Sequence, residues 1–315
     1  GWVAMEKKDY TTAVNEFQQV IDQNSRLAES YRAEGIAYYS EKAYPEAIAA
    51  FSRSLNNMDD PDKEFKKDVQ FYLAQARMDY GEVDKAIEVY SEILKAGEDE
   101  QAFFLRGKAY ISMEDYKNAE KDFQRALEGC EDYNLYINIY QIYVDHNKAV
   151  DGDDYLKMAL ELEPQDGEDC YHRGRIYEYE KNYEAARDEL KTAMEQGYED
   201  AMLLLGRVYL EMEDPASARS MYQEYLQKSE QGAKAYNGLA MCDIYDGAYD
   251  SALENIAQGL KENSKEDEQG LLYNEIVAYE YKRDFATAKE KMKIYLEQYP
   301  EDEAALRENE FLSTR

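Results

Sequence analysis

The chain has 315 residues and carries 37 lysines and arginines against 68 aspartates and glutamates, which gives a formal net charge of −31 at pH 7. A protein this acidic repels phosphate polyanions and anionic lipid surfaces, so we expect no nucleic acid among its partners. Disorder does not follow from the charge, because 44% of the residues are hydrophobic and 13% are aromatic. No apolar stretch approaches the roughly 18–20 residues that span a bilayer, and we therefore predict no transmembrane segment.

A small residue recurs along the chain at intervals of 32 to 39 residues, and large apolar residues follow it four and eight positions later. Such a series places the three side chains on one face of an α-helix. In chain order it predicts helices that include residues 13–21, 47–55, 86–94, 119–127, 152–160, 186–194, 218–226, 252–260 and 288–296.

A second helix is predicted upstream of each of these. In four copies a glycine lies 12 residues before the small residue, with a tyrosine three residues after it. These glycines are Gly35, Gly107, Gly174 and Gly206. Because glycine inside a helix costs about 1 kcal/mol relative to alanine, its recurrence predicts that a neighbouring helix packs against bare backbone there.

Aromatic residues and prolines mark the connections. Pro45 and Pro215 fall where the later helix of a pair begins, Pro164 and Pro300 follow its end, and Pro61 lies in one enlarged connection. An aromatic residue marks the turn between the two helices in six copies. These residues are Tyr10, Tyr44, Tyr116, Tyr183, Tyr249 and Phe285. The unit is therefore a helical hairpin of about 34 residues that occurs nine times.

This pattern resembles the tetratricopeptide repeat, and the resemblance covers essentially the whole chain. Residues 105–127 (LRGKAYISMEDYKNAEKDFQRAL) are close to the consensus throughout. The departures from it are local: the third copy has Ala74 and Arg77 at the glycine and tyrosine positions, and the fifth has Tyr140 for the glycine.

The resemblance implies an all-α fold, a right-handed superhelical α-solenoid of helix–turn–helix repeats. The first helix of each repeat would line a concave groove and the second would form the convex back. We expect a single solenoid over residues 1–315, with the first repeat truncated at Gly1 and residues 301–315 forming a C-terminal capping helix. Trp2 is predicted to pack against the second repeat.

No constellation of residues suggests catalysis. The sequence has no phosphate-binding glycine loop and no hydrolase or metalloprotease motif. Cys130, Cys170 and Cys242 lack disulfide or metal spacing, and we expect them to be buried or inert thiols. His146 and His172 have no nucleophile near them in sequence. We therefore predict no catalytic residue, metal or cofactor, and no enzymatic activity.

The groove-facing stripe of the first helices is rich in aromatic and aliphatic residues, with one cation at the centre of several rows. Long aromatic side chains with a polar tip are typical anchors at protein interfaces. We therefore expect the groove to bind a protein or peptide partner. The predicted groove residues are Arg32, Tyr39, Phe71, Phe104, Lys108, Tyr171, Arg175, Tyr179, Arg207, Tyr245, Tyr273 and Tyr281.

Lys108, Arg175 and Arg207 share one register, and two interpretations of them remain open. They either form a basic stripe that captures a carboxylate, or they pair locally, Arg175 with Glu178 and Arg207 with Glu211.

Three functions are compatible with these features. The first is a non-enzymatic scaffold that binds a peptide or helical segment of a partner in the concave groove. The second is an exported, lipid-anchored assembly component of a bacterial cell envelope, whose anchor would precede Gly1. The third is a binder of glycans or small molecules. The compartment is unknown from these residues, with a slight preference for an extracytoplasmic, membrane-anchored location, and we expect a monomer or weak oligomer.

Overall fold

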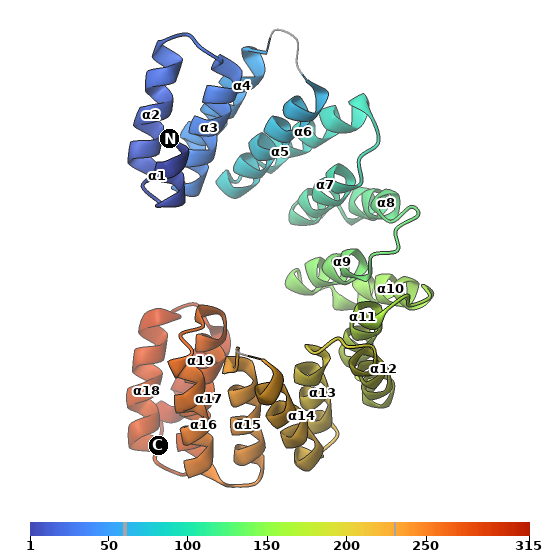
Figure 1. Ribbon diagram of the computed structural model, residues 1–315, viewed down its shortest axis with the longest axis vertical. Coiled ribbons are helices and arrows are strands. Elements are labelled where there is room, and N and C mark those ends of the chain that lie inside the picture. Colours follow the sequence, from blue (N-terminus) through green and yellow to red (C-terminus); the bar gives the residue numbers. More distant parts are fainter. Residues whose placement is uncertain (59–61, 230) are drawn as a thin grey trace. The chain divides into compact units, whose positions relative to one another are not determined.

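The computed structural model describes residues 1–58, 62–229 and 231–315. Within these ranges the chain forms nineteen helices and no strand. The helices follow one another in antiparallel hairpins (Figure 1), as expected for an all-α superhelical solenoid of helix–turn–helix repeats. The predicted fold class is thereby confirmed. Two compact units divide the chain, residues 1–157 and 158–315.

The first unit holds four hairpins, the first of them with a short initial helix, and most of a fifth. Its helices are α1 (Trp2–Glu6), α2 (Tyr10–Asp22), α3 (Leu27–Ser40), α4 (Tyr44–Asn56), α5 (Lys63–Tyr80), α6 (Val83–Ala96), α7 (Glu100–Ser112), α8 (Tyr116–Ala126), α9 (Tyr133–Asp145) and α10 (Ala149–Leu160).

The second unit begins in the last turn of α10 and contains four hairpins followed by a single helix. Its helices are α11 (Gly167–Tyr179), α12 (Tyr183–Glu195), α13 (Ala201–Glu211), α14 (Pro215–Lys228), α15 (Ala233–Tyr245), α16 (Tyr249–Lys261), α17 (Lys265–Tyr281), α18 (Phe285–Gln298) and α19 (Glu303–Ser313).

The recurring glycines let the two helices of a hairpin approach closely. A Cβ built on Gly107 would lie 2.7 Å from the ring of Phe123, and one on Gly174 would lie 2.6 Å from Leu190. Gly35 and Gly206 meet Phe51 and Tyr222 in the same way. In each hairpin the contacting side chain belongs to the second helix, four residues after the small residue. The predicted packing against bare backbone is confirmed.

The turn inside each hairpin uses the left-handed backbone region. Five residues before the small residue, φ is positive in every hairpin, from 57° at Asn147 to 89° at Gly81. Gly81 and Gly247 adopt this conformation without steric cost, whereas the other seven hairpins place a side chain there. The aromatic residues predicted for this turn begin the second helix instead, as Tyr10 and Phe285 do.

Many of the acidic residues cap helices. The side chain of Asp115 accepts a hydrogen bond from the backbone N–H of Asn118 at 3.2 Å, and Asp166 accepts from two N–H groups at the start of α11. Such capping satisfies N–H groups that have no partner within the helix. In the part of the chain that the structure describes, side-chain caps are seen at ten helices, formed by Asp9, Asp62, Asp99, Asp115, Asp132, Asp166, Asn182, Asp214, Asp284 and Asp302.

One prediction about an individual residue was wrong. The Trp2 side chain is 52% exposed, and its ring meets Phe17 of its own hairpin at 5.4 Å between centroids. The reason is register: Gly1 faces Phe17 as Gly35 faces Phe51, so Trp2 falls on the groove-facing stripe. The thiols agree with the expectation of buried or inert cysteines: Cys170 and Cys242 are buried, and partial burial raises the pKa of the Cys130 thiol.

Four of the five prolines lie where they were predicted. Pro215 is the first residue of α14 and Pro45 the second of α4, while Pro164 and Pro300 follow the ends of α10 and α18. Pro61 lies outside the described residues.

Helix α19 packs on the last hairpin. Its buried side chains Ala305 and Leu312 join a core with Met292 and Tyr295 of α18. The Tyr295 hydroxyl donates a hydrogen bond of 2.5 Å to Asp302, which also caps α19.

The glycine contacts should be sensitive to a single methyl group. Gly107→Ala gains roughly 1 kcal/mol of helix propensity but forces the added methyl against the Phe123 ring, and overpacking costs about 1–3 kcal/mol. We therefore expect a net loss of stability, measured by urea unfolding. Gly270→Ala in α17 is the matched control, because its nearest neighbour lies 3.3 Å away at a side-chain end. Equal or greater stability of Gly107→Ala would contradict this packing.

The C-terminal helix should respond to pH. Partial burial and the nearby Glu308 of α19 raise the pKa of Glu280 in α17 to about 7. One Glu280 carboxylate oxygen is buried and has no hydrogen-bond partner among the residues that the structure describes. A carboxyl group with a raised folded-state pKa contributes stability that is present below its unfolded pKa and is lost as the pH rises through the folded value. Stability should therefore fall between about pH 4.5 and about pH 7.

Glu280→Gln should remove this dependence, because the amide is neutral throughout. The measurement is the urea midpoint across this pH range, with Glu310→Gln on the exposed side of α19 as control. A wild-type pH dependence that persists in Glu280→Gln would assign the effect to another group.

Candidate functional site

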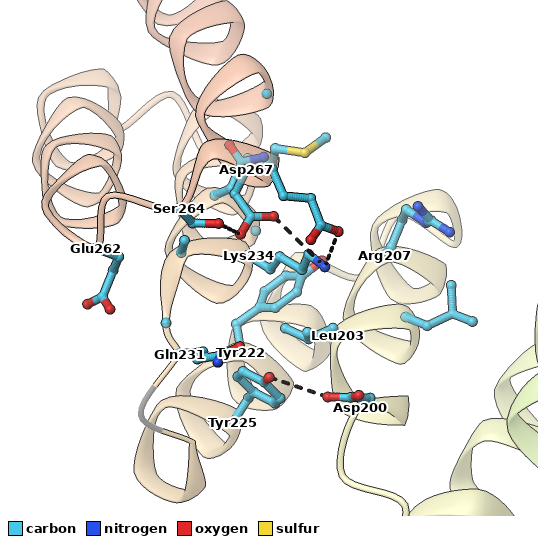
Figure 2. Close-up of a pocket in the computed structure, with 18 of the residues that line it drawn as sticks. Asp200, Leu203, Arg207, Tyr222, Tyr225, Gln231, Lys234, Glu262, Ser264 and Asp267 are labelled. Carbon is cyan, nitrogen blue, oxygen red and sulfur yellow. Dashed lines mark hydrogen bonds and ion pairs between the residues drawn. The ribbon is translucent and has the colours of Figure 1, made fainter. Parts of the chain in front are cut away.

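In the second unit the first helices α11, α13, α15 and α17 lie next to one another in that order. Residues of α11, α13 and α15, the start of α17 and two tyrosines of α14 line a cavity of about 800 Å³. Figure 2 shows this cavity, with Tyr222 in its wall between Lys234 and Tyr225. Two predicted groove residues, Tyr171 and Arg207, line it.

Arg207 is held by the preceding repeat. Its guanidinium makes two contacts with the Glu178 carboxylate, at 2.5 and 2.7 Å, and Glu178 is largely buried. The predicted partner, Glu211, instead accepts a hydrogen bond from Tyr183. The local pairing interpretation was thus right about the type of interaction and wrong about the partner: Arg207 pairs with a carboxylate of the neighbouring first helix α11 and not with one on its own helix.

Lys234 is likewise held by the following repeat. Its ammonium lies 3.0 Å from Glu266 and 4.0 Å from Asp267, both at the start of α17. Asp267 also accepts a hydrogen bond from the Ser264 hydroxyl at 2.6 Å. Figure 2 shows these contacts converging over the cavity. Both cations that line the cavity are therefore neutralised by carboxylates of the chain itself.

Tyr222 reaches the cavity through a gap between two first helices. Cβ atoms built on Gly206 of α13 and Gly238 of α15 would lie 2.5 and 2.3 Å from its ring. The side chain is 4% exposed, and burial raises the pKa of its hydroxyl, which stays protonated at neutral pH. The side chain lines the cavity, and no hydrogen bond from its hydroxyl to the residues that the structure describes is seen.

The stripe continues along α15 and α17 with exposed apolar side chains. Met241 is 43% exposed, Tyr245 is 54% exposed and Tyr281 is 60% exposed. The Tyr281 ring stacks on Tyr249 with centroids 6.1 Å apart. Tyr273, further back on α17, is partly buried and meets Tyr295 edge to face.

Tyr171, Arg175 and Tyr179 occupy the stripe on α11 and are all partly buried. The Tyr171 ring lies 4.9 Å from that of Tyr198, and the Arg175 guanidinium lies 5.9 Å from the Tyr171 centroid. Arg175 also lies 3.3 Å from Nδ1 of His172, so this row is already engaged in local contacts.

In the first unit the stripe joins successive repeats. Arg32 pairs with Asp68 of the next repeat and lies 5.3 Å from the Tyr72 ring, while the Tyr39 hydroxyl donates a 2.5 Å hydrogen bond to Asp79.

The other predicted groove residues of the first unit make fewer contacts with neighbouring repeats. Phe71 and Phe104 are partly buried against Tyr90 and Phe123 of the second helices. Lys108 is exposed, and no ion pair is seen for it within the described ranges. Arg175 and Arg207 lie on adjacent first helices of the second unit, whereas Lys108 belongs to the first.

The sequence alone did not single out Tyr222 or Gly238. Tyr222 carries the register of a core residue, as Phe51 and Phe123 do. The signal that could have found the cavity is Gly238, because the equivalent position in the other repeats holds a residue with a side chain. Those residues are Ala33, Tyr72, Leu105, Asn138, His172, Leu204 and Asn274.

The two histidines have structural contacts. Nδ1 of His146 lies 2.8 Å from the carbonyl oxygen of Ile142, one turn earlier. His172 is buried beside Glu168 and Arg175. None of the helices that the structure describes has the length and apolar character needed to cross a membrane.

Stacked helical hairpins with a cavity on their first helices define a helical-repeat protein. The family model described as "Tetratricopeptide repeat" matches residues 1–62, 171–233 and 203–268, and a second model of the same description matches residues 100–132. The chain belongs to the tetratricopeptide repeat family. Proteins of this family are generally non-catalytic scaffolds for protein–protein interaction.

Solved structures share the fold at low sequence identity. Yeast Tom70 is 15% identical with a TM-score of 0.53, covering 93% of this chain and 76% of Tom70. A tetratricopeptide repeat protein from Parabacteroides merdae is 12% identical with a TM-score of 0.51, covering 80% of this chain and 100% of that one.

A curated relative, the BBSome complex member BBS4 of Bos taurus, is 26% identical over 103 residues. The match covers 32% of this chain and spans only about a fifth of the length of that relative.

Proposed function

We propose that this chain is a non-enzymatic scaffold that binds an extended or helical segment of a partner protein along its first-helix stripe. The observation that carries the proposal is the row of exposed apolar side chains Met241, Tyr245 and Tyr281 next to a cavity of about 800 Å³. Apolar surface of this kind is unfavourable in water and becomes favourable when a partner covers it.

The composition of the stripe supports a protein ligand. Tyrosine and methionine are enriched at protein interfaces, because they offer large contact areas with adaptable or polar tips. The cavity offers both apolar walls and charged groups, which suits a peptide with mixed side chains.

A binding role without chemistry fits the environment of the titratable groups. The thiols of Cys170 and Cys242 have raised pKa values because both are buried, which disfavours the nucleophilic thiolate. His146 is anchored to the backbone of its own helix.

The test is a binding comparison on the full chain with peptides selected from a display library of random dodecapeptides. Replacing Met241, Tyr245 and Tyr281 together by Ala should weaken binding by roughly tenfold or more, because buried aromatic anchors dominate interface energies. Circular dichroism should show unchanged helicity, since all three side chains are exposed.

The matched control replaces Ile294 and Val150, which are 45% and 82% exposed on second helices, by Ala. Affinity should stay at the wild-type level in this control. Equal affinity of the triple variant and the wild type would remove the first-helix stripe as the binding surface.

A further inference from the structure

Helix α19 is attached to the last hairpin through a small apolar contact. Among its 11 residues the buried ones are Ala305 and Leu312, whereas Leu306 is 44% exposed. The two buried side chains rest on Met292 and Tyr295 of α18. An isolated helix of this length is marginal in water, so α19 stays helical because it is docked.

Two carboxyl groups meet where α17 faces α19. Glu280 of α17 and Glu308 of α19 are both partly buried, and their side chains lie within hydrogen-bond reach of each other. Carboxylates accept hydrogen bonds but donate none, so this contact requires one of the two groups to carry a proton. When both groups are ionised, two like charges face each other in a site where water hydrates them poorly.

The cations around this pair make their contacts with other groups. These contacts are Lys289 to the backbone carbonyl of Arg315, Lys291 to Glu275, Arg307 to Glu303, Lys282 to Asp250 and Arg219 to Asp246. Arg283 and Lys293 are exposed. Within the described residues no ion pair is seen for Glu280 or Glu308. A shared proton, and not a cation, therefore holds the two carboxyl groups together.

One further titratable group faces the pair from α17. The pKa of the Tyr273 hydroxyl is raised by its burial and by Glu308 and Glu280, so this group stays protonated and neutral at physiological pH. Residues 301–315 carry five acids against two arginines, in a chain whose net charge is −31. The wider electrostatic field therefore also opposes docking of α19 once the shared proton is lost.

We infer that α19 is a pH-controlled cover, docked on the last hairpin while Glu280 and Glu308 share a proton and released when both are ionised. Release uncovers the apolar surface on which Ala305 and Leu312 rest, including Met292 of α18. The cover is separate from the proposed binding along the first-helix stripe and does not depend on it.

The direction of the effect follows from the linkage between docking and the proton. Burial, and then Glu308, raise the pKa of Glu280 from its ordinary value of 4.5 to about 7 in the docked state. Such a group favours the docked state below its undocked pKa, and this contribution is lost as the pH rises through the docked value. The equilibrium constant for release should therefore increase roughly 30- to 100-fold from about pH 5 to about pH 8.

Hydrogen–deuterium exchange of the full chain, followed by mass spectrometry, separates local release from unfolding of the whole hairpin. Protection factors are compared across this pH range, since they remove the intrinsic pH dependence of amide exchange. The protection of α19 should fall roughly 30- to 100-fold, while that of α7 in the first unit stays constant. Low urea concentrations should accelerate exchange in α18 and leave α19 unchanged, because local release exposes little surface.

Glu280→Gln should keep the protection of α19 at its acid-pH level throughout, because the amide is neutral and can donate an N–H to Glu308. Glu308→Gln should act in the same direction, since its amide donates to the Glu280 carboxylate. Glu310→Gln, exposed on the same helix, should retain the wild-type pH dependence. Circular dichroism at about pH 5 checks that each variant folds.

Three results would overturn the inference. The first is a wild-type protection of α19 that does not change with pH. The second is a pH dependence that persists in both Glu280→Gln and Glu308→Gln. The third is exchange of α19 only together with α18, with the same urea dependence, which would mean that the helix never opens by itself.

Discussion

The structure depends on one recurring contact, in which a large side chain of the second helix lies against the bare backbone of a glycine in the first. Phe51, Phe123, Leu190 and Tyr222 make this contact in four hairpins. Each glycine gives up about 1 kcal/mol of helix propensity, and the close approach of two helices compensates through buried apolar area and dispersion. Because a hairpin buries only one side in this way, its outer side must be covered by the next hairpin, and stacking follows.

Several of the many acidic residues have structural roles that the sequence alone does not reveal. Aspartates begin many of the helices, where their carboxylates satisfy backbone N–H groups and favour the positive end of the helix dipole. Others link helices: Asp122 accepts two hydrogen bonds of 2.7 Å from Arg106, and Asp243 binds Arg219 and Asn255. Both of these aspartates are 5% exposed, so their partners are needed to offset the cost of burial. Several of the groove cations likewise pair with carboxylates of the chain itself and link neighbouring helices.

The second unit shows how a repeat scaffold acquires a specific site through one small change. Gly238 removes a side chain from the wall of α15, and the ring of Tyr222 occupies the gap between this glycine and Gly206. The equivalent second-helix residue is purely apolar at Phe51, Phe123 and Leu190, whereas the third hairpin also has a tyrosine there, Tyr90. Gly238 thus lets the hydroxyl of Tyr222, a second-helix residue, reach the side on which the first helices carry Met241 and Tyr245.

The sequence by itself determined the hairpin, its period and the side of each helix that packs, because these follow from local periodicity and contacts between sequence neighbours. The glycines, the small residues and four of the five prolines fall where that pattern put them. The tertiary structure decided which groups meet across repeats. Arg207 pairs with Glu178 because α11 and α13 lie side by side, and Trp2 is exposed because its register places it on the stripe. Tyr222 faces a cavity because glycines on two different helices leave room for it. Such contacts join residues about 16 to 40 positions apart, and their geometry depends on helix spacing that no single repeat specifies.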